Sequence, residues 1–227
     1  MKKKFAHYLC LVAVCALFSS CFRVEEFVQL YRDGSGKLEL TINMSASSGA
    51  LQLAKNLAAY TDDTPPDKKI EASFNKTISK LQAIEGISEV AIDRDDKSFI
   101  YKLKFDFTDT DALNTAMNQF FKDSNSESIE FFNYKKSTFD RTDVTSIQSA
   151  VEKEMGSEGS KLYGMDPYAL FKDVKYTTTY LFERKVKSVS NAESEIQANS
   201  HQVQLVYYPF NKAKSENSSL NNTIKLK

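Results

Sequence analysis

The chain contains three cysteines, Cys10, Cys15 and Cys21, and all of them lie within its first 21 residues. Three lysines at the start are followed by an apolar run from about residue 8 to residue 18. That run is too short for a membrane span, which takes about 20 apolar residues. A basic start, a short apolar middle and small residues before a cut are typical of a secretory signal peptide. The pattern therefore predicts a signal peptide over residues 1–20.

The predicted cut falls directly before Cys21, in the stretch "LFSSC" (residues 17–21). This stretch resembles the lipobox of bacterial lipoproteins, in which the cysteine is lipidated on sulfur, becomes residue one and is acylated on nitrogen. It departs from the usual pattern in having Phe18, not leucine, three places before the cysteine. The resemblance implies lipidation at Cys21, with residues 21–26 as a lipid-anchored tether. Several acyl chains on one cysteine give firm membrane anchoring, whereas one chain alone is marginal.

After this cleavage, few residues remain that could form a disulfide, bind a metal or act in catalysis. Cys21 is then the only cysteine, so no internal disulfide is available. His201 is the only histidine; a lone histidine does not make a zinc site, and we expect it to be a polar residue that opens a strand. The acidic stretch Asp93, Arg94, Asp95, Asp96 lacks the glycine and the distant glutamate of an EF-hand loop and is expected to be a solvated hairpin tip. The sequence therefore predicts no metal, no cofactor and no catalytic residue.

Two alternatives to a non-catalytic protein or domain remain open. Acidic residues are common, so an envelope hydrolase that uses paired carboxylates is one alternative. A structural subunit of an envelope protein complex is the other. A buried carboxylate pair favours the hydrolase, a closed apolar cavity favours ligand binding, and a large exposed apolar patch favours a protein partner.

Composition limits the partners of the mature chain. The full sequence has 30 basic and 30 acidic residues, and removal of Lys2, Lys3 and Lys4 leaves 27 against 30. A net charge near −3 gives no reason to expect nucleic-acid binding, which requires a basic patch. Phenylalanine and tyrosine are frequent while glycine and proline are scarce. We therefore expect one folded domain over residues 27–227.

Hydrophobic periodicity predicts alternating hairpins and helices. Residues 27–44 are expected to form a β-hairpin that turns at Asp33–Gly36, because apolar and polar residues alternate from residue 38 to residue 44. Helices are expected at 50–60 and 68–84, the second ending at Gly86. A second hairpin covers 87–107, and Thr108 and Asp111 have the spacing of a capping box for the next helix. The remaining expected elements are a strand near 129–134, a helix at 144–155, a loop at 156–164, and strands at 174–182, 184–196 and 201–208.

These elements predict an α+β fold, with an antiparallel sheet built from hairpins and helices packed mainly on one face. The anchor, the stretch "YRDGSGKLELTI" and the late segment from Tyr176 to Tyr207 together resemble lipoproteins with an LppM-like domain. Lys185, Val186, Ser190 and Asn191 fit the turn of that family, and Val203, Leu205 and Tyr207 fit its closing strand. The resemblance implies an envelope binding module that suits lipid-like ligands, and it brings no catalytic residues.

The expected function is therefore that of a lipid-anchored envelope protein of a diderm bacterium, with a non-catalytic binding or structural role. Its partners are expected to be the membrane, through the lipid, and a lipid-like or apolar ligand or an envelope protein. Phe22 follows the cysteine where an aspartate retains lipoproteins at the inner membrane in known sorting systems, which favours the outer membrane. The residues "RVEE" (23–26) also fit an acidic signal for export to the cell surface.

Overall fold

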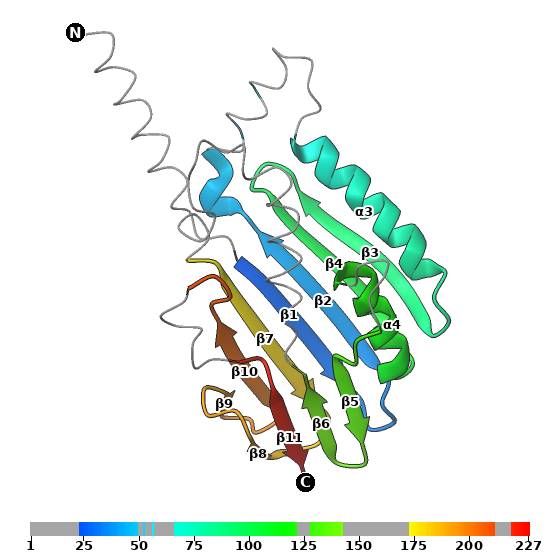
Figure 1. The fold of residues 1–227 in the computed structure, drawn as a ribbon, viewed down its shortest axis with the longest axis vertical. Helices are drawn as coiled ribbons and strands as arrows, with labels where there is room; N and C mark the ends of the chain where they lie inside the picture. Colours follow the sequence, from blue (N-terminus) through cyan, green and yellow to red (C-terminus); the bar gives the residue numbers. More distant parts are fainter. Residues whose placement is uncertain are drawn as a thin grey trace, which may run out of the picture.

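The computed structural model describes residues 23–49, 52, 56, 66–121, 128–142, 173–211 and 219–227. Cys21, the signal peptide, the predicted helix at 144–155 and the predicted loop at 156–164 lie outside these residues, as does most of the predicted helix at 50–60. In the described part, two sheets and two α-helices form an α+β fold (Figure 1), which confirms the predicted class.

The larger sheet has seven strands in the order β3–β4–β2–β1–β7–β10–β9. Their bounds are β1 Arg23–Leu30, β2 Gly36–Asn43, β3 Ile87–Asp95, β4 Ile100–Phe107, β7 Lys175–Phe182, β9 Glu195–Ile196 and β10 Gln202–Tyr207. The smaller sheet has four strands in the order β5–β6–β11–β8, with bounds β5 Phe132–Lys135, β6 Thr138–Arg141, β8 Val186–Val189 and β11 Asn222–Leu226. The second sheet was not predicted.

Strand β1 lies in the middle of the larger sheet. It pairs antiparallel with β2, as the predicted hairpin requires, but it pairs parallel with β7, with Arg23 opposite Lys175 and Leu30 opposite Phe182. The expectation of a purely antiparallel sheet is therefore wrong at this pair. Adjacent parallel strands need a crossover connection, and here the chain from β2 to β6 separates the two strands.

Strand β1 also begins earlier than expected. Residues 23–26, predicted to belong to a tether, form the first half of the strand. Glu26 is 1% exposed and pairs with Leu40 on one side and Thr178 on the other. In the alternating pattern of β1, Glu26, Val28 and Leu30 point to the buried face. The folded domain therefore includes residues that we had assigned to the anchor region.

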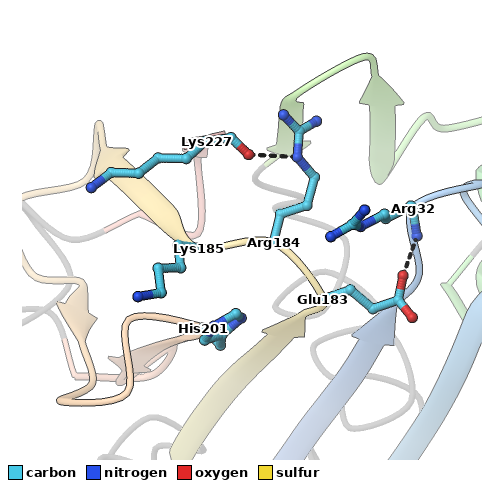
Figure 2. A pocket seen from close by; sticks show the side chains of 6 residues that line it. All are labelled: Arg32, Glu183, Arg184, Lys185, His201 and Lys227. Atoms are coloured by element: carbon cyan, nitrogen blue, oxygen red, sulfur yellow. Dashed lines mark hydrogen bonds between the residues drawn. The ribbon is translucent and has the colours of Figure 1, made fainter.

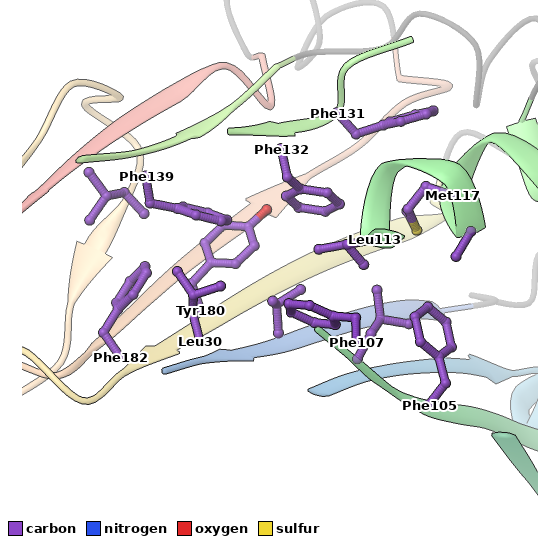
Figure 3. Packing of buried hydrophobic residues seen from close by; sticks show 14 of the residues in the cluster. Leu30, Phe105, Phe107, Leu113, Met117, Phe131, Phe132, Phe139, Tyr180 and Phe182 are labelled. Atoms are coloured by element: carbon purple, nitrogen blue, oxygen red, sulfur yellow. The ribbon is translucent and has the colours of Figure 1, made fainter. Parts of the chain in front are cut away.

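In the view of Figure 1, α4 (Thr110–Phe121) and the smaller sheet lie in front of the larger sheet, and α3 (Pro66–Gln82) runs alongside the edge strand β3. Figure 3 shows the core between these layers, where Phe132 and Phe139 of the smaller sheet face Leu30, Tyr180 and Phe182. The ring centroid of Phe139 lies 5.1 Å from that of Tyr180 and 5.4 Å from that of Phe182. Whether helices cover mainly one face in the whole chain stays a prediction, because two predicted helices lie largely outside the described residues.

Two predicted helix boundaries differ in detail. The N-terminal cap of α4 is Asp109, whose Oδ1 accepts a hydrogen bond of 2.8 Å from the backbone N–H of Ala112. Thr108 does not fill this role, since its own N–H bonds to the carbonyl of Gly86. Helix α3 ends at Gln82, and Gly86, with φ of 85°, lies in the turn that leads into β3. Glycine suits this position because it adopts positive φ without strain.

Candidate functional site

The residues weighed for chemistry from the sequence do not come together in one site. Cys21 lies outside the described residues. His201 precedes β10, as predicted, and its Nδ1 lies 3.1 Å from the carbonyl oxygen of Phe182. Tyr180 and Phe182, large aromatic residues of β7, are 1% and 3% exposed and belong to the core, so they do not line an apolar binding groove.

The acidic stretch at residues 93–96 is engaged with protein groups. Asp93 forms an ion pair with Lys104, and Arg94 pairs with both Asp96 and Glu71 of α3. These pairs lower the pKa of Asp93 and raise that of Arg94, in each case mainly through the side-chain hydrogen bonds. Asp95 accepts hydrogen bonds from the backbone N–H groups of Lys97 and Ser98 and closes the turn. Within the described residues, no group of three or more His, Cys, Asp or Glu side chains is placed to hold a metal ion.

A buried polar cluster, which was not predicted from the sequence, joins the two sheets. The carboxylate of Glu26 accepts hydrogen bonds from Arg141 Nη2 (3.1 Å), from the hydroxyl of Tyr176 (2.7 Å) and from the hydroxyl of Tyr180 (3.0 Å). Arg141 lies on β6 and the tyrosines flank Thr178, the partner of Glu26 on β7. The alternation of β1 places an acidic residue on its apolar face, and this was the signal that could have revealed the cluster.

Burial and charge act in opposite directions on Arg141. Loss of solvent, the largest single effect, lowers the pKa of its guanidinium, but the charge of Glu26, the nearby Tyr180 and Tyr176 and the hydrogen bond to Glu26 together outweigh it and hold the pKa above the usual range. Burial, reinforced by the Glu26 charge, raises the pKa of both Tyr176 and Tyr180 well above the usual value for a phenol. Both phenols therefore remain neutral hydrogen-bond donors to Glu26 at neutral pH.

This arrangement favours a structural role over acid–base catalysis. A paired-carboxylate hydrolase needs two acidic groups about 5–10 Å apart at a solvent-accessible bond. In the part of the chain that the structure describes, Glu26 is the only buried acidic residue, and its two oxygens bind an arginine and two phenols. The guanidinium of Arg141 also lies over the ring of Phe132, 4.6 Å from its centroid. The cluster thus connects the layers and offers no free base.

Two asparagines of α4 hold the segment before β5. Asn114 donates a hydrogen bond to the carbonyl of Phe132 (2.8 Å) and accepts bonds from the N–H groups of Phe131 and Phe132. Asn118 bonds in the same way to both backbone groups of Ile129. Both asparagines also line a polar pocket of about 430 Å³, and their amide groups there are already hydrogen-bonded to the backbone.

A second pocket, of about 560 Å³, lies at the end of the larger sheet where β1 and β7 finish. Its lining residues are charged or polar, and we call it the basic cleft: Arg32, Glu183, Arg184, Lys185, His201 and Lys227. Figure 2 shows that they come from the β1–β2 turn, the β7–β8 connection, the residue before β10 and the residue after β11. Segments far apart in the sequence thus converge on one opening, which periodicity alone did not predict.

Two hydrogen bonds fix side chains of the basic cleft. Glu183 Oε2 accepts a hydrogen bond of 3.0 Å from the backbone N–H of Arg32. Arg184 donates from Nε to the main-chain oxygen of Lys227 (2.6 Å), and from Nη1 to the carbonyl of Lys136 (3.0 Å). These hydrogen bonds order the rim of the cleft. Of its six lining residues, four are arginine or lysine, one is Glu183 and one is His201.

Comparisons with known proteins assign neither a family nor a function to the chain. No family model matches the chain, and no curated protein matches it. The folded domain of LppM from Mycobacterium tuberculosis, solved by NMR, is similar in structure with a TM-score of 0.40 and 10% sequence identity; the match covers 92% of this chain and 90% of that domain. This is a weak likeness of fold to the type of domain that the sequence resembled, and it assigns no site. None of the described helices is both long and apolar enough to cross a membrane.

Proposed function

We propose that this chain is a non-catalytic protein of the envelope of a diderm bacterium, anchored by lipid on Cys21 at the outer membrane, with a binding or structural role. The observation that carries the proposal is the stretch "LFSSC" (residues 17–21), which is followed almost at once by a folded strand. A lipid at Cys21 then attaches directly to the central strand of the sheet.

The short connection determines how the domain sits. Only Phe22 separates Cys21 from β1, and an extended chain spans at most about 3.3–3.6 Å per residue, so the start of β1 cannot be more than about 7 Å from the lipidated residue. The end of the sheet that contains Arg23, Asn43 and Lys175 therefore faces the membrane. The basic cleft lies at the opposite end of β1, roughly 25 Å further from the bilayer at about 3.3 Å per strand residue.

The non-catalytic part of the proposal rests on the state of the described side chains. Glu26 is bound by three donors, and the acidic residues of the 93–96 stretch have protein partners. An apolar ligand has no evident place among the described residues, since Tyr180 and Phe182 pack in the core and Ile196, 40% exposed, is the one large hydrophobic side chain at the surface. A polar ligand or a protein partner suits this surface better.

Metabolic labelling with a palmitate analogue tests the anchor. Label on the wild-type chain and none on Cys21→Ala is the expected result, and a Cys15→Ala variant is the matched control that keeps the label. Equal labelling of wild type and Cys21→Ala contradicts lipidation at this residue. Separation of inner and outer membranes on a density gradient then tests the location, and recovery of the labelled chain in the inner membrane contradicts the outer-membrane assignment.

A further inference from the structure

We propose that the basic cleft is a binding site for a phosphorylated ligand, either a soluble phosphorylated molecule or a phosphate-bearing headgroup. This proposal rests on the proposed binding role and names the class of ligand that is bound. Ligand binding in the cleft does not depend on the lipid anchor. The first observation is an imbalance of charge. The cleft collects the side chains of Arg32, Arg184, Lys185 and Lys227 around the carboxylate of Glu183 and the carboxyl end of Lys227, which binds Arg184.

Arg32 and Lys185 differ from the lysines on the exposed face of β2 and β4. On the exposed face of β2, β3 and β4, lysines are matched with acids in the pairs Lys37–Asp106, Lys102–Glu39 and Lys104–Asp93. In the described part of the chain, the side chains of Arg32 and Lys185 have no hydrogen-bond or ion-pair partner. Glu183 does not neutralise Arg32 through its side chain, because its carboxylate accepts from the backbone N–H of that residue. Like charges gathered without partners repel one another, so an anion between them is stabilised.

The cleft also holds donors in fixed positions. The main-chain oxygens of Lys227 and Lys136 accept hydrogen bonds from Nε and Nη1 of Arg184, so this guanidinium is held in one orientation. The carbonyl oxygen of Phe182 accepts a hydrogen bond from Nδ1 of His201, which fixes the ring; Nε2 of the neutral ring is then an acceptor, so His201 is not counted among the donors to an anion. Preorganised donors lose little side-chain entropy when an anion binds. Arginine and lysine together provide the forked and the point-charge contacts by which proteins bind phosphate.

Size and polarity restrict the class of ligand. A volume of about 560 Å³ is within the range of small-molecule sites and is larger than one inorganic ion needs. The lining residues are all charged or polar, and their aliphatic portions provide more of the lining surface than their polar atoms do, so the ligand combines charged groups with some carbon surface. A molecule with more than one phosphate, or with a phosphate on a sugar or glycerol, fits both properties. With the anchor at the other end of β1, the cleft faces away from the membrane that holds the protein.

Calorimetric titration of the chain that begins at Phe22 tests the site. All described strands and helices lie after Phe22, and this chain lacks Cys21, so the result is independent of lipidation. The probes are tripolyphosphate and glycerol 3-phosphate, with glycerol as the uncharged comparison. Flotation with phosphatidylglycerol vesicles, against phosphatidylcholine vesicles, tests the headgroup as the source. Arg32→Gln with Lys185→Gln removes two unpaired cations, and Lys135→Gln with Lys187→Gln removes the same charge from exposed positions of the smaller sheet.

Binding of a phosphate probe that weakens about tenfold or more in the Arg32/Lys185 variant, and less than about twofold in the Lys135/Lys187 variant, supports the site. Cleft-dependent binding in solution assigns a soluble ligand, and cleft-dependent binding to the anionic vesicles alone assigns a headgroup. Equal loss in the two variants overturns the proposal, because it shows a response to net charge. Absence of binding to every phosphate probe and to both vesicles overturns it as well. Loss of lipid labelling at Cys21, by contrast, leaves these outcomes unchanged and affects the anchor alone.

Discussion

Glu26 and Arg141 are 115 residues apart in the chain, and a hydrogen bond of 3.1 Å between Oε2 of Glu26 and Nη2 of Arg141 joins the larger sheet to the smaller one. Both side chains are essentially inaccessible to water. A buried ion pair adds little stability compared with apolar residues, but each charge becomes expensive when its partner is removed. The pair therefore defines how one sheet is placed on the other.

Removal of one charge from this pair is expected to destabilise the fold strongly. Glu26→Gln leaves the buried guanidinium of Arg141 without a counter-charge and should lower the free energy of unfolding by about 3–5 kcal/mol. Urea unfolding followed by circular dichroism measures the change. Glu25→Gln, on the opposite face of β1, is the matched control. Similar losses in the two variants would show that the buried pair has no special role.

The two tyrosines of the cluster predict a loss of stability at high pH. Their pKa values are raised in the folded state, so the unfolded chain loses its phenolic protons first, from about pH 10 upward. The stability that they contribute is complete below pH 10 and falls as the pH rises, by up to about 1.4 kcal/mol per pH unit for each tyrosine. Tyr176→Phe with Tyr180→Phe should flatten this decline in urea unfolding measured from pH 8 to pH 11. An unchanged slope contradicts the assignment, and the neutral-pH stability of the variant provides the reference.

Gly36, at the start of β2, has no room for a side chain. A Cβ atom there would lie 2.1 Å from the carbonyl oxygen of Gln29 and 2.5 Å from Cζ of Phe107. The first neighbour is backbone of the paired strand β1 and cannot move without opening the sheet. Gly36→Ala should therefore lower the free energy of unfolding by about 1–3 kcal/mol. Gly49→Ala is the control, since a Cβ at Gly49 meets nothing within 4 Å, and equal effects of both changes would contradict the steric reason.

Asn114 tests the connection between α4 and β5. Asn114→Asp keeps the acceptor for the N–H groups of Phe131 and Phe132 but replaces the donor to the carbonyl of Phe132 with an oxygen. The free energy of unfolding should fall by about 1–3 kcal/mol, because a buried carbonyl loses its partner. Thr115→Ala, which removes an exposed side chain on the next position of the helix, is the control and should change it by less than about 0.5 kcal/mol. Thermal unfolding compares the two.

Local periodicity was a good guide to the long strands. The alternation in residues 99–107 correctly placed Tyr101, Leu103, Phe105 and Phe107 on the buried face of β4, and the same pattern identified β7. It did not predict β6 or β11, because strands of four or five residues show little more than two alternations. It also said nothing about which strands pair. The parallel contact of β1 with β7 joins residues that no local pattern relates.

The candidate sites could be predicted from the sequence less well than the fold. The basic cleft draws on four separate segments, so its composition follows from the strand order and not from any motif. Glu26 was assigned to the tether because the charged stretch after Cys21 suggested an exposed segment. Its alternation with Val28 and Leu30 was the contrary evidence. His201, expected only to open a strand, has that position and lies in the cleft as well.

The pairing of β1 with β7 has a consequence for how the protein is made. A ribosome adds about 5–20 residues per second, so roughly eight to thirty seconds separate the synthesis of Arg23 from that of its partner Lys175. During that interval one edge of the central strand has no hydrogen-bonding partner, and such an edge is prone to pair with other chains. Contacts between distant residues also slow folding. The nascent chain is therefore expected to remain largely unfolded until its last third has been synthesised, and to need protection from aggregation until then.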